Sequence, residues 1–335
     1  MLKSTRRFGV EIEFVAPSPE SMRTIRRLIH VVDDGSLRPL QNAGEWVSEP
    51  LSGKAGEKRV ITACKVLKKY KASCENVKTS MHIHLDGKVG EGVLKSSRTS
   101  PKTAQPVFAF SNKLKGELGV GSILDIVSRR HFGIIDGHVT EIDNITYHSK
   151  VELVRKPRLN YTYYYLEKPD RFKWLKNSFY FYTLFSGVME NIVSNSRRFG
   201  NMYCIPLGDS YAIEEIANMN DMAELKNLWY KGRDPRQAMQ PRYDDSRYHN
   251  VNLHSFWDRH GTLEIRSHGG TIEHNKVLLW LRLHQTIADK LEDIEFDELR
   301  LITGTPEEFI KFVDDEMLSE YIKRLLGYYS GIKIK

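Results

Sequence analysis

Charged and imidazole side chains occur in pairs, two residues apart, in three segments that are otherwise apolar. Residues i and i+2 of a strand lie on the same face, about 6.6–6.8 Å apart. Each segment therefore predicts a strand with one apolar face and one face that carries chemistry. The pairs are Glu11/Glu13 around Ile12, His82/His84 around Ile83, and Glu264/Arg266 around Ile265.

These residue types favour metal and phosphate chemistry. A solvent-exposed sheet face is the usual explanation of a single alternating strand, but such faces are normally rich in Thr, Lys and Ser. Carboxylates and imidazoles are metal ligands, and two neighbouring carboxylates repel each other unless a cation lies between them. Arginine is well suited to binding phosphate. Glutamates with one or two histidines favour Mg²⁺ or Mn²⁺ bound together with phosphate oxygens, whereas zinc sites use more His and Cys.

Other signals near these strands are weaker on their own. Glu45 lies in a strand-like segment after an Asp-Gly loop and offers another carboxylate. Gly269-Gly270-Thr271 permits either close approach of a phosphate or a plain strand-to-helix turn. The P-loop pattern and the Gly-rich dinucleotide motif are both missing from the sequence. A nucleotide, if one binds, must therefore be bound through metals and side chains.

Mixed strands and helices are predicted to position these residues. The apolar patterns predict strands at 8–16, 45–51, 79–87, 248–256 and 262–268. They predict helices at 21–30, 57–72 and 213–232, a further helix after Gly270, and mainly helix at 160–198. A capping box at Thr305–Glu308 starts the last helix. Because strands and helices do not alternate regularly, the predicted fold class is α+β with an antiparallel sheet.

Composition excludes several classes of protein. The chain has 335 residues, with 50 Lys+Arg and 43 Asp+Glu, and its formal net charge of +7 does not require nucleic acid. No apolar segment approaches the ~20 residues that span a bilayer, and the N-terminus lacks a signal-peptide pattern, so we expect no membrane partner. The three cysteines, Cys64, Cys74 and Cys204, form no CxxC motif. They predict reduced, buried thiols and a cytoplasmic location.

Taken in order, these segments resemble the putative amidoligase family, which is grouped with glutamine synthetase and glutamate–cysteine ligase as carboxylate–amine ligases. The resemblance covers about the first 86 residues and roughly residues 245–290. Departures from the usual family pattern at Ser80-Met81 and Ser267-His268 affect the expected pocket shape more than the metal ligands. The motifs are FGVEIEF (8–14), DGS (34–36), GEWVSEPL (44–51), HIH (82–84), VNL (251–253), TLEIR (262–266) and GT (270–271).

The resemblance implies a glutamine-synthetase-like fold. In it, a curved antiparallel sheet holds divalent ions and ATP on its concave face, and helices pack on its outer face. It implies a single ligase-like catalytic domain over residues 1–335. Residues 87–244 match no part of the pattern, and we expect them to form a helix-rich insertion or subdomain.

The resemblance also implies a role for each candidate residue. One ion would be held by Glu11, His82 and Glu264, and another by Glu13 and Glu45. Glu264 and Arg266 would be catalytic, and Arg266 would contact the transferred phosphoryl group. The implied cofactor-binding residues are His84, which would face the nucleotide phosphates, Arg266, Asn252 and Arg247.

The resulting hypothesis is ATP-dependent amide formation through an acyl phosphate, with ATP and Mg²⁺ (or Mn²⁺) as cofactors. The implied partners are a carboxylate substrate and an amine acceptor of peptide or amino-acid type, with an amidotransferase or peptidase as an accessory partner by family analogy. Two alternatives stay open. One is a metal-dependent hydrolase that uses the HxH pair, and the other is a non-catalytic basic protein that binds nucleotide or nucleic acid. Because no base-stacking motif is present, we do not expect nucleic acid.

Overall fold

The described part of the chain forms one helix-and-sheet unit and a second unit of strands. This computed structural model describes residues 4, 6–37, 40–74, 79–87, 171–198, 200–232, 244–257 and 261–334, and the backbone of short strands between 93 and 167. The chain divides into two compact units. The first is Met1–Lys88 with Arg171–Lys335, and the second is Val89–Asp170.

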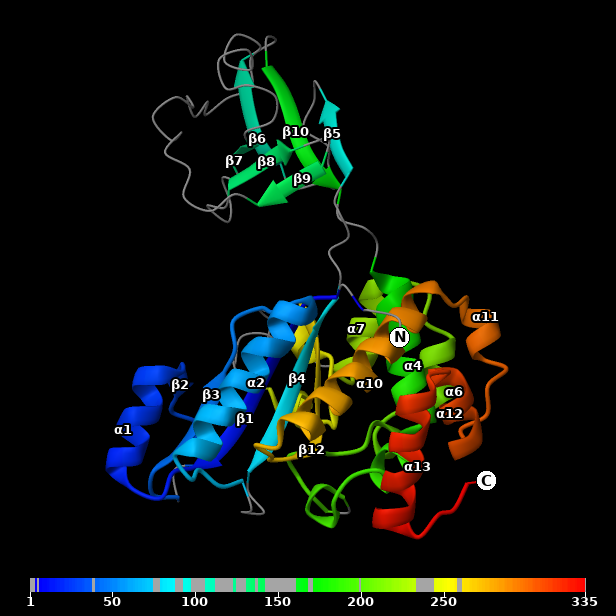
Figure 1. Ribbon diagram of the computed structural model, residues 1–335. Coiled ribbons are helices and arrows are strands. Elements are labelled where there is room, and N and C mark those ends of the chain that lie inside the picture. Colours follow the sequence, from blue (N-terminus) through cyan, green and yellow to red (C-terminus); the bar gives the residue numbers. More distant parts are fainter. Residues whose placement is uncertain are drawn as a thin grey trace. The chain divides into compact units, whose positions relative to one another are not determined.

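An antiparallel sheet forms the centre of the first unit (Figure 1). Its six strands within the described residues run in the order β11-β12-β4-β1-β3-β2, and every neighbouring pair is antiparallel. The strand order differs from the chain order, so segments far apart in the sequence become neighbours. The strands are β1 (Phe8–Val15), β2 (Val31–Val32), β3 (Ala43–Val47), β4 (Ser80–Asp86), β11 (Val251–Asn252) and β12 (Thr262–Gly269).

The two faces of this sheet differ in chemistry, as the alternation predicts. One face is apolar and buried, and the helices α2 (Gly53–Lys69) and α10 (His274–Asp293) lie along it (Figure 1). Gly56 lets α2 approach closely, because a Cβ there would meet Phe8 Cζ and Leu51 Cβ at 2.9 Å. The apolar face consists of Phe8, Val10, Ile12, Phe14, Met81, Ile83, Leu85, Leu263 and Ile265.

A second layer of helices packs on α10. The aromatic helix α4 (Phe172–Leu184) contacts α10 and is buried along most of its length. Phe181 and Phe185 of its C-terminal end pack on Phe309 of α12. The other helices among the described residues are α1 (Pro19–Leu28), α5 (Ser186–Asn191), α6 (Ile213–Ala217), α7 (Met222–Trp229), α9 (His254–Trp257), α11 (Phe296–Leu299), α12 (Pro306–Val313) and α13 (Glu316–Ser330), with short 3₁₀ turns η1 (Gly35–Leu37), η3 (Asn195–Arg197), η4 (Leu207–Asp209) and η5 (Asp245–Tyr248).

The predicted α+β class with an antiparallel sheet is confirmed. The expected cap at Thr305 is also present, since its hydroxyl accepts a hydrogen bond from Glu308 N at 3.3 Å. The three cysteines are free and buried. None of the helices among the described residues combines the length and apolar character needed to cross a bilayer.

Two expected elements differ from the structure. The strand predicted at 248–256 is only two residues long, because the Asn252 side chain accepts from His254 N at 2.8 Å and starts helix α9. The segment 160–198 begins with a strand, β10 (Tyr161–Glu167), before α4 starts at Phe172. Its run of tyrosines favours a strand over a helix.

From the sequence, we expect an insertion or subdomain over residues 87–244. The second compact unit covers Val89–Asp170, and the chain from Arg171 onward belongs to the unit that contains the six-stranded sheet. The reason is the packing of α4, whose buried face lies against α10. In the second unit, the described elements are the strands β5 (Val93–Ser97), β6 (Pro106–Ser111), β7 (Ile123–Leu124), β8 (His131–Ile135), β9 (His138–Glu141) and β10, in the sheets β5-β10-β6 and β7-β8-β9.

A fully buried arginine connects the sheet to α10. Arg6 donates to Asp289 Oδ1 at 2.8 Å, to Asp86 O at 2.7 Å and to Glu292 Oε2 at 3.0 Å. Its guanidinium also lies 5.0 Å from the centre of the Trp174 ring. A buried charge is tolerated only when its donors are satisfied, as they are here.

We predict that Arg6→Met lowers the free energy of unfolding by about 3 kcal/mol, because it removes one partner of a buried ion pair. Arg7→Met is the matched control. Arg7 binds Asp86 from a side chain that is 56% exposed, so its loss should cost less than about 1 kcal/mol. Urea unfolding of both variants checks this, and equal losses would contradict it.

Candidate active site on the polar face of the sheet

The register of the strands brings the paired polar residues side by side. Glu11 of β1 lies opposite His82 of β4, and His84 lies opposite Glu264 of β12. On the other side of β1, Glu13 lies opposite Glu45 of β3. All of these residues face away from the apolar layer, so four strands contribute to one polar surface.

Glu11, His82 and Glu264 form the first cluster. His82 Nδ1 lies 3.1 Å from Glu11 Oε2 and 3.5 Å from Glu264 Oε1. The ligand atoms of the three residues all lie within 4.8 Å of one another. Ser80 Oγ lies 2.8 Å from His82 Nε2 and fixes the orientation of the ring. Such a group can hold one metal ion.

Glu13, Asp34 and Glu45 form the second cluster, whose oxygens also lie within 4.8 Å of one another. Glu13 Oε2 accepts from Ser80 N at 2.5 Å, which ties this cluster to β4. Asp34 is the member that sequence reasoning did not select as a ligand. It comes from the loop before η1, and its only signal was the Asp34-Gly35-Ser36 turn.

Burial, together with repulsion between carboxylates, disfavours the charged form of the glutamates in the second cluster. Burial raises the pKa of Glu45 well above its usual value, and the negative charges of Glu11, Asp34 and Glu13 raise it further. Burial also raises the pKa of Glu13, although His82 opposes the shift. Among the described residues, no Lys or Arg forms an ion pair with Glu13 or Glu45. A divalent cation would relieve this repulsion.

Positively charged neighbours, His84 and Arg266, flank the first cluster. Burial alone would raise the pKa of Glu11, but His84 and hydrogen bonds from both histidines hold it well below its usual value. Burial opposes the charged form of His84, yet Glu11 raises the pKa of that imidazole to about 9. Burial also opposes the charged form of Glu264, but Arg266 lowers its pKa to about 2.

Glu264 is held at both oxygens. Arg266 Nη1 donates to its Oε1 and Asn252 Nδ2 to its Oε2, each at 2.6 Å. Asn252, expected among the cofactor-binding residues, therefore contacts a candidate metal ligand. Arg247 of η5 donates to the Tyr248 hydroxyl at 2.6 Å and lies over that ring.

The two histidines of the HxH pair occupy different places. His82 belongs to the first cluster, whereas His84 lies 3.3 Å from Glu11 Oε1 and 3.0 Å from Thr262 Oγ1. The clusters therefore contain mainly carboxylate oxygens, with a single imidazole. This donor set fits Mg²⁺ or Mn²⁺ better than zinc.

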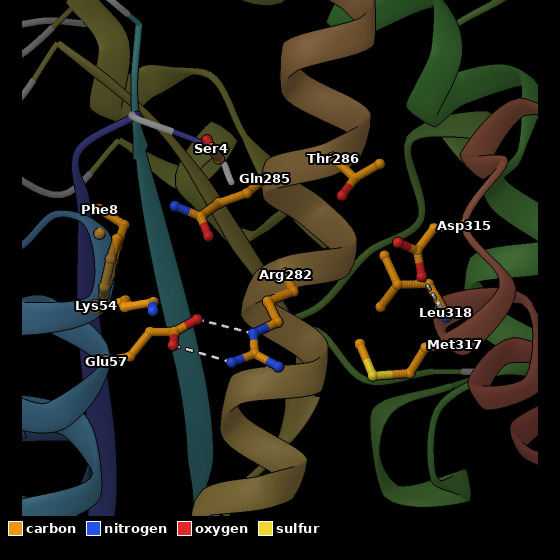
Figure 2. Close-up of a pocket in the computed structure, with 11 residues that line it drawn as sticks. Ser4, Phe8, Lys54, Glu57, Arg282, Gln285, Thr286, Asp315, Met317 and Leu318 are labelled. Atoms are coloured by element: carbon orange, nitrogen blue, oxygen red, sulfur yellow. Dashed lines mark hydrogen bonds and ion pairs between the residues drawn. The ribbon is translucent and has the colours of Figure 1, made fainter. Parts of the chain in front are cut away.

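A hollow of about 160 Å³ lies elsewhere, among α2, α10 and α13 (Figure 2). Glu57 and Arg282 point toward each other across it and form two hydrogen bonds of 2.8 and 2.9 Å. Asp315 accepts from Leu318 N and caps α13. These polar groups already form hydrogen bonds with one another or with the main chain, and none of the candidate metal ligands lines the hollow. We therefore place the functional site on the polar face of the sheet.

We predict that Glu45→Gln stabilises the protein in a chelator at neutral pH, because it removes a charge from a group of neighbouring carboxylates. An increase in melting temperature of about 1–3 °C corresponds to about 1 kcal/mol. The increase should shrink as the pH falls through the raised pKa of folded Glu45, and it should disappear below the usual pKa of a glutamate, where Glu45 is neutral in both the folded and the unfolded state. Added Mg²⁺ should raise the melting temperature of the wild type but not of the variant.

The control is Glu49→Gln, which removes a charge from a side chain that is 54% exposed and lies just beyond β3. It should leave both the chelator and the Mg²⁺ melting temperatures nearly unchanged. A lower melting temperature of Glu45→Gln in chelator would show that the carboxylate stabilises the fold and would contradict the prediction.

Comparison with known proteins finds similarity to one protein family in part of the chain. A family model described as putative amidoligase enzyme matches residues 168–288. This range contains Asn252, Glu264 and Arg266, and it extends into residues 168–244, where the sequence analysis found no similarity. The candidate ligands on β1, β3 and β4 lie outside it. No curated protein matches the chain significantly. The family model confirms the resemblance of this chain to the putative amidoligase family, over residues 168–288, and suggests that the protein is a ligase.

Proposed function

We propose that this protein is an ATP-dependent carboxylate–amine ligase that works through an acyl phosphate. The observation that carries the proposal is the presence of two carboxylate clusters next to a half-buried arginine, Arg266, on one sheet face. A ligase must bring a carboxylate and a triphosphate together, and both are anions. Such a reaction needs concentrated positive charge in a site that also orients its reactants.

The two clusters would hold the divalent ions of Mg²⁺-ATP. Glu11, His82 and Glu264 would bind one ion, and Glu13, Asp34 and Glu45 the other. When bound, Mg²⁺ would neutralise the phosphate oxygens. Ser80 supports both clusters, because its hydroxyl contacts His82 and its N–H binds Glu13.

The side chains of β12 and β4 have separate tasks in this proposal. Arg266 carries a fixed positive charge beside Glu264 and would stabilise negative charge on the transferred phosphoryl group. His84 would face the nucleotide phosphates with its charged form favoured by Glu11. Asn252 is a positioning residue, because it holds Glu264 in place.

The proposed reaction has two balanced steps. A carboxylate oxygen of the substrate attacks the γ-phosphorus of ATP, the bond to the β–γ bridging oxygen breaks, and ADP leaves. The amine nitrogen of the acceptor then attacks the acyl carbon, and the bond from that carbon to the phosphate oxygen breaks. The products are an amide, inorganic phosphate, ADP and a proton.

We predict that ATP binds in the presence of Mg²⁺ or Mn²⁺ and not in a chelator, and that Glu264→Gln weakens the metal-dependent binding by about tenfold or more. The physical reason is that Gln cannot supply an anionic ligand to the ion. Titration calorimetry with ATP measures this. Phosphate release with mixtures of carboxylates and amines then tests turnover, which Glu264→Gln should abolish.

The matched control is Glu273→Gln, which changes an exposed glutamate just before α10 that forms an ion pair with Lys68. It should bind Mg²⁺-ATP like the wild type. Full metal-dependent ATP binding by Glu264→Gln would remove the proposed role of the first cluster. Hydrolytic activity that needs zinc and no ATP would instead support the metal-dependent hydrolase.

A further inference from the structure

Arg197 is a buried cation that the proposed function does not yet use. It lies at the end of η3, next to β12, and is 5% exposed. Its Nη2 donates to the main-chain oxygen of Arg266 at 2.8 Å, while its Nε is buried without a hydrogen-bond partner. Among the described residues, no carboxylate forms an ion pair with Arg197. A buried guanidinium without a counter-ion is costly.

A bulge in β12 is the point where Arg197 meets the site. The register between β12 and β4 shifts between Ile265 and His268, so Arg266 has no paired residue on β4. Its main-chain groups form hydrogen bonds elsewhere. Its N–H donates to Asn250 O at 2.8 Å and its carbonyl accepts from Arg197. Gly269 lies against the same segment, because a Cβ there would meet Ser194 Oγ at 3.3 Å and Arg197 Cγ at 4.0 Å.

Unsatisfied polar atoms surround this bulge. Arg266 Nε and Asn250 Oδ1 are buried without a hydrogen-bond partner, as is Arg197 Nε. The nearby Cys204 cannot neutralise the arginines, because burial raises the pKa of its thiol and keeps it uncharged. Burial lowers the pKa of Arg197 and the charge of Arg266 lowers it further, while the charge of Glu13 acts in the opposite direction. An anion beside the two arginines would neutralise the charge of Arg197 and accept hydrogen bonds from the free Nε–H groups of Arg197 and Arg266.

We propose that Arg197 and Arg266 together bind one oxyanion, a phosphoryl or carboxylate group, at the bulge of β12. Planar guanidinium groups match the oxygens of both anions through paired hydrogen bonds. The proposal rests on the proposed function for the source of the anion, either the γ-phosphoryl group of ATP or the substrate carboxylate. Arg197 is then an anion-binding residue supplied by the segment between α5 and η4.

The test is calorimetric titration of the protein with inorganic phosphate and, separately, with acetate, each in Mg²⁺ and in chelator. Wild type should bind at least one probe, and Arg197→Gln should weaken that binding by about tenfold or more, the loss expected for a charge-assisted hydrogen bond. Loss of phosphate binding identifies the phosphoryl group as the source, and loss of acetate binding identifies the carboxylate.

Arg198→Gln is the matched control from the same segment. Arg198 is also buried, but its guanidinium donates to the main-chain oxygens of Val193 and Asn191 at 2.8 and 3.4 Å. This variant should lower the melting temperature while anion affinity stays within about twofold of the wild type. If Arg197 only supported the bulge, Arg197→Gln would behave in the same way.

Arg197→Lys covers the case in which the glutamine variant does not fold. Lysine keeps the buried charge but lacks the planar fork, so its anion affinity should also fall. Equal affinity in wild type and folded Arg197 variants, or no binding of either probe by the wild type, overturns the proposal. Failure of Mg²⁺-ATP binding together with Arg197-dependent anion binding would instead remove the ligase and leave the oxyanion site.

Discussion

Repulsion among carboxylates on one face of the sheet is the constraint on which the rest of the structure depends. Two unit charges 4 Å apart repel by about 4 kcal/mol at an effective dielectric constant of 20. The sheet nevertheless places Glu13 directly opposite Glu45, with Asp34 beside them. The first cluster offsets its own charge through His84 and Arg266, whereas no such ion pair reaches Glu13 or Glu45 among the described residues. The second cluster is thus the stronger argument for a bound cation.

The opposite face of the same strands provides the stability that this arrangement requires. Every charged position on β1, β4 and β12 alternates with a fully buried aliphatic residue, such as Ile12, Ile83 or Ile265. Burial of such side chains contributes about 2 kcal/mol each. Arg6 then fixes α10 to the edge of this layer. The strands cannot slip by one residue, because a slip would place the carboxylates in the core.

The sequence predicted what depends on local pattern. Alternation around three isoleucines is sufficient to place Glu11, His82 and Glu264 on one type of face, and the irregular order of strands and helices predicts the fold class. The resemblance implied how these residues group, and the register brings the same groups together, with Asp34 added from a loop. Pairing between distant strands is decided by tertiary packing, so periodicity alone could not assign neighbours. The same reason explains why the hydrogen bond from Asn252 to Glu264 could not be predicted from the sequence.

Arg197 illustrates the limit of local pattern most clearly. It lies in a short polar turn with no periodicity, and only the bulge in β12 gives it a neighbour in the site. The family match includes Arg197 and Arg266 but not the β1 and β3 carboxylates. One part of the chain therefore supplies the arginines of the face and another supplies most of its carboxylates. The two parts meet where His82 of β4 lies 3.5 Å from Glu264 of β12. A ligand that carries both metal ions and phosphate would be oriented by this division, because its metal ions are attracted to the carboxylates and its phosphate to the arginines of the same sheet face.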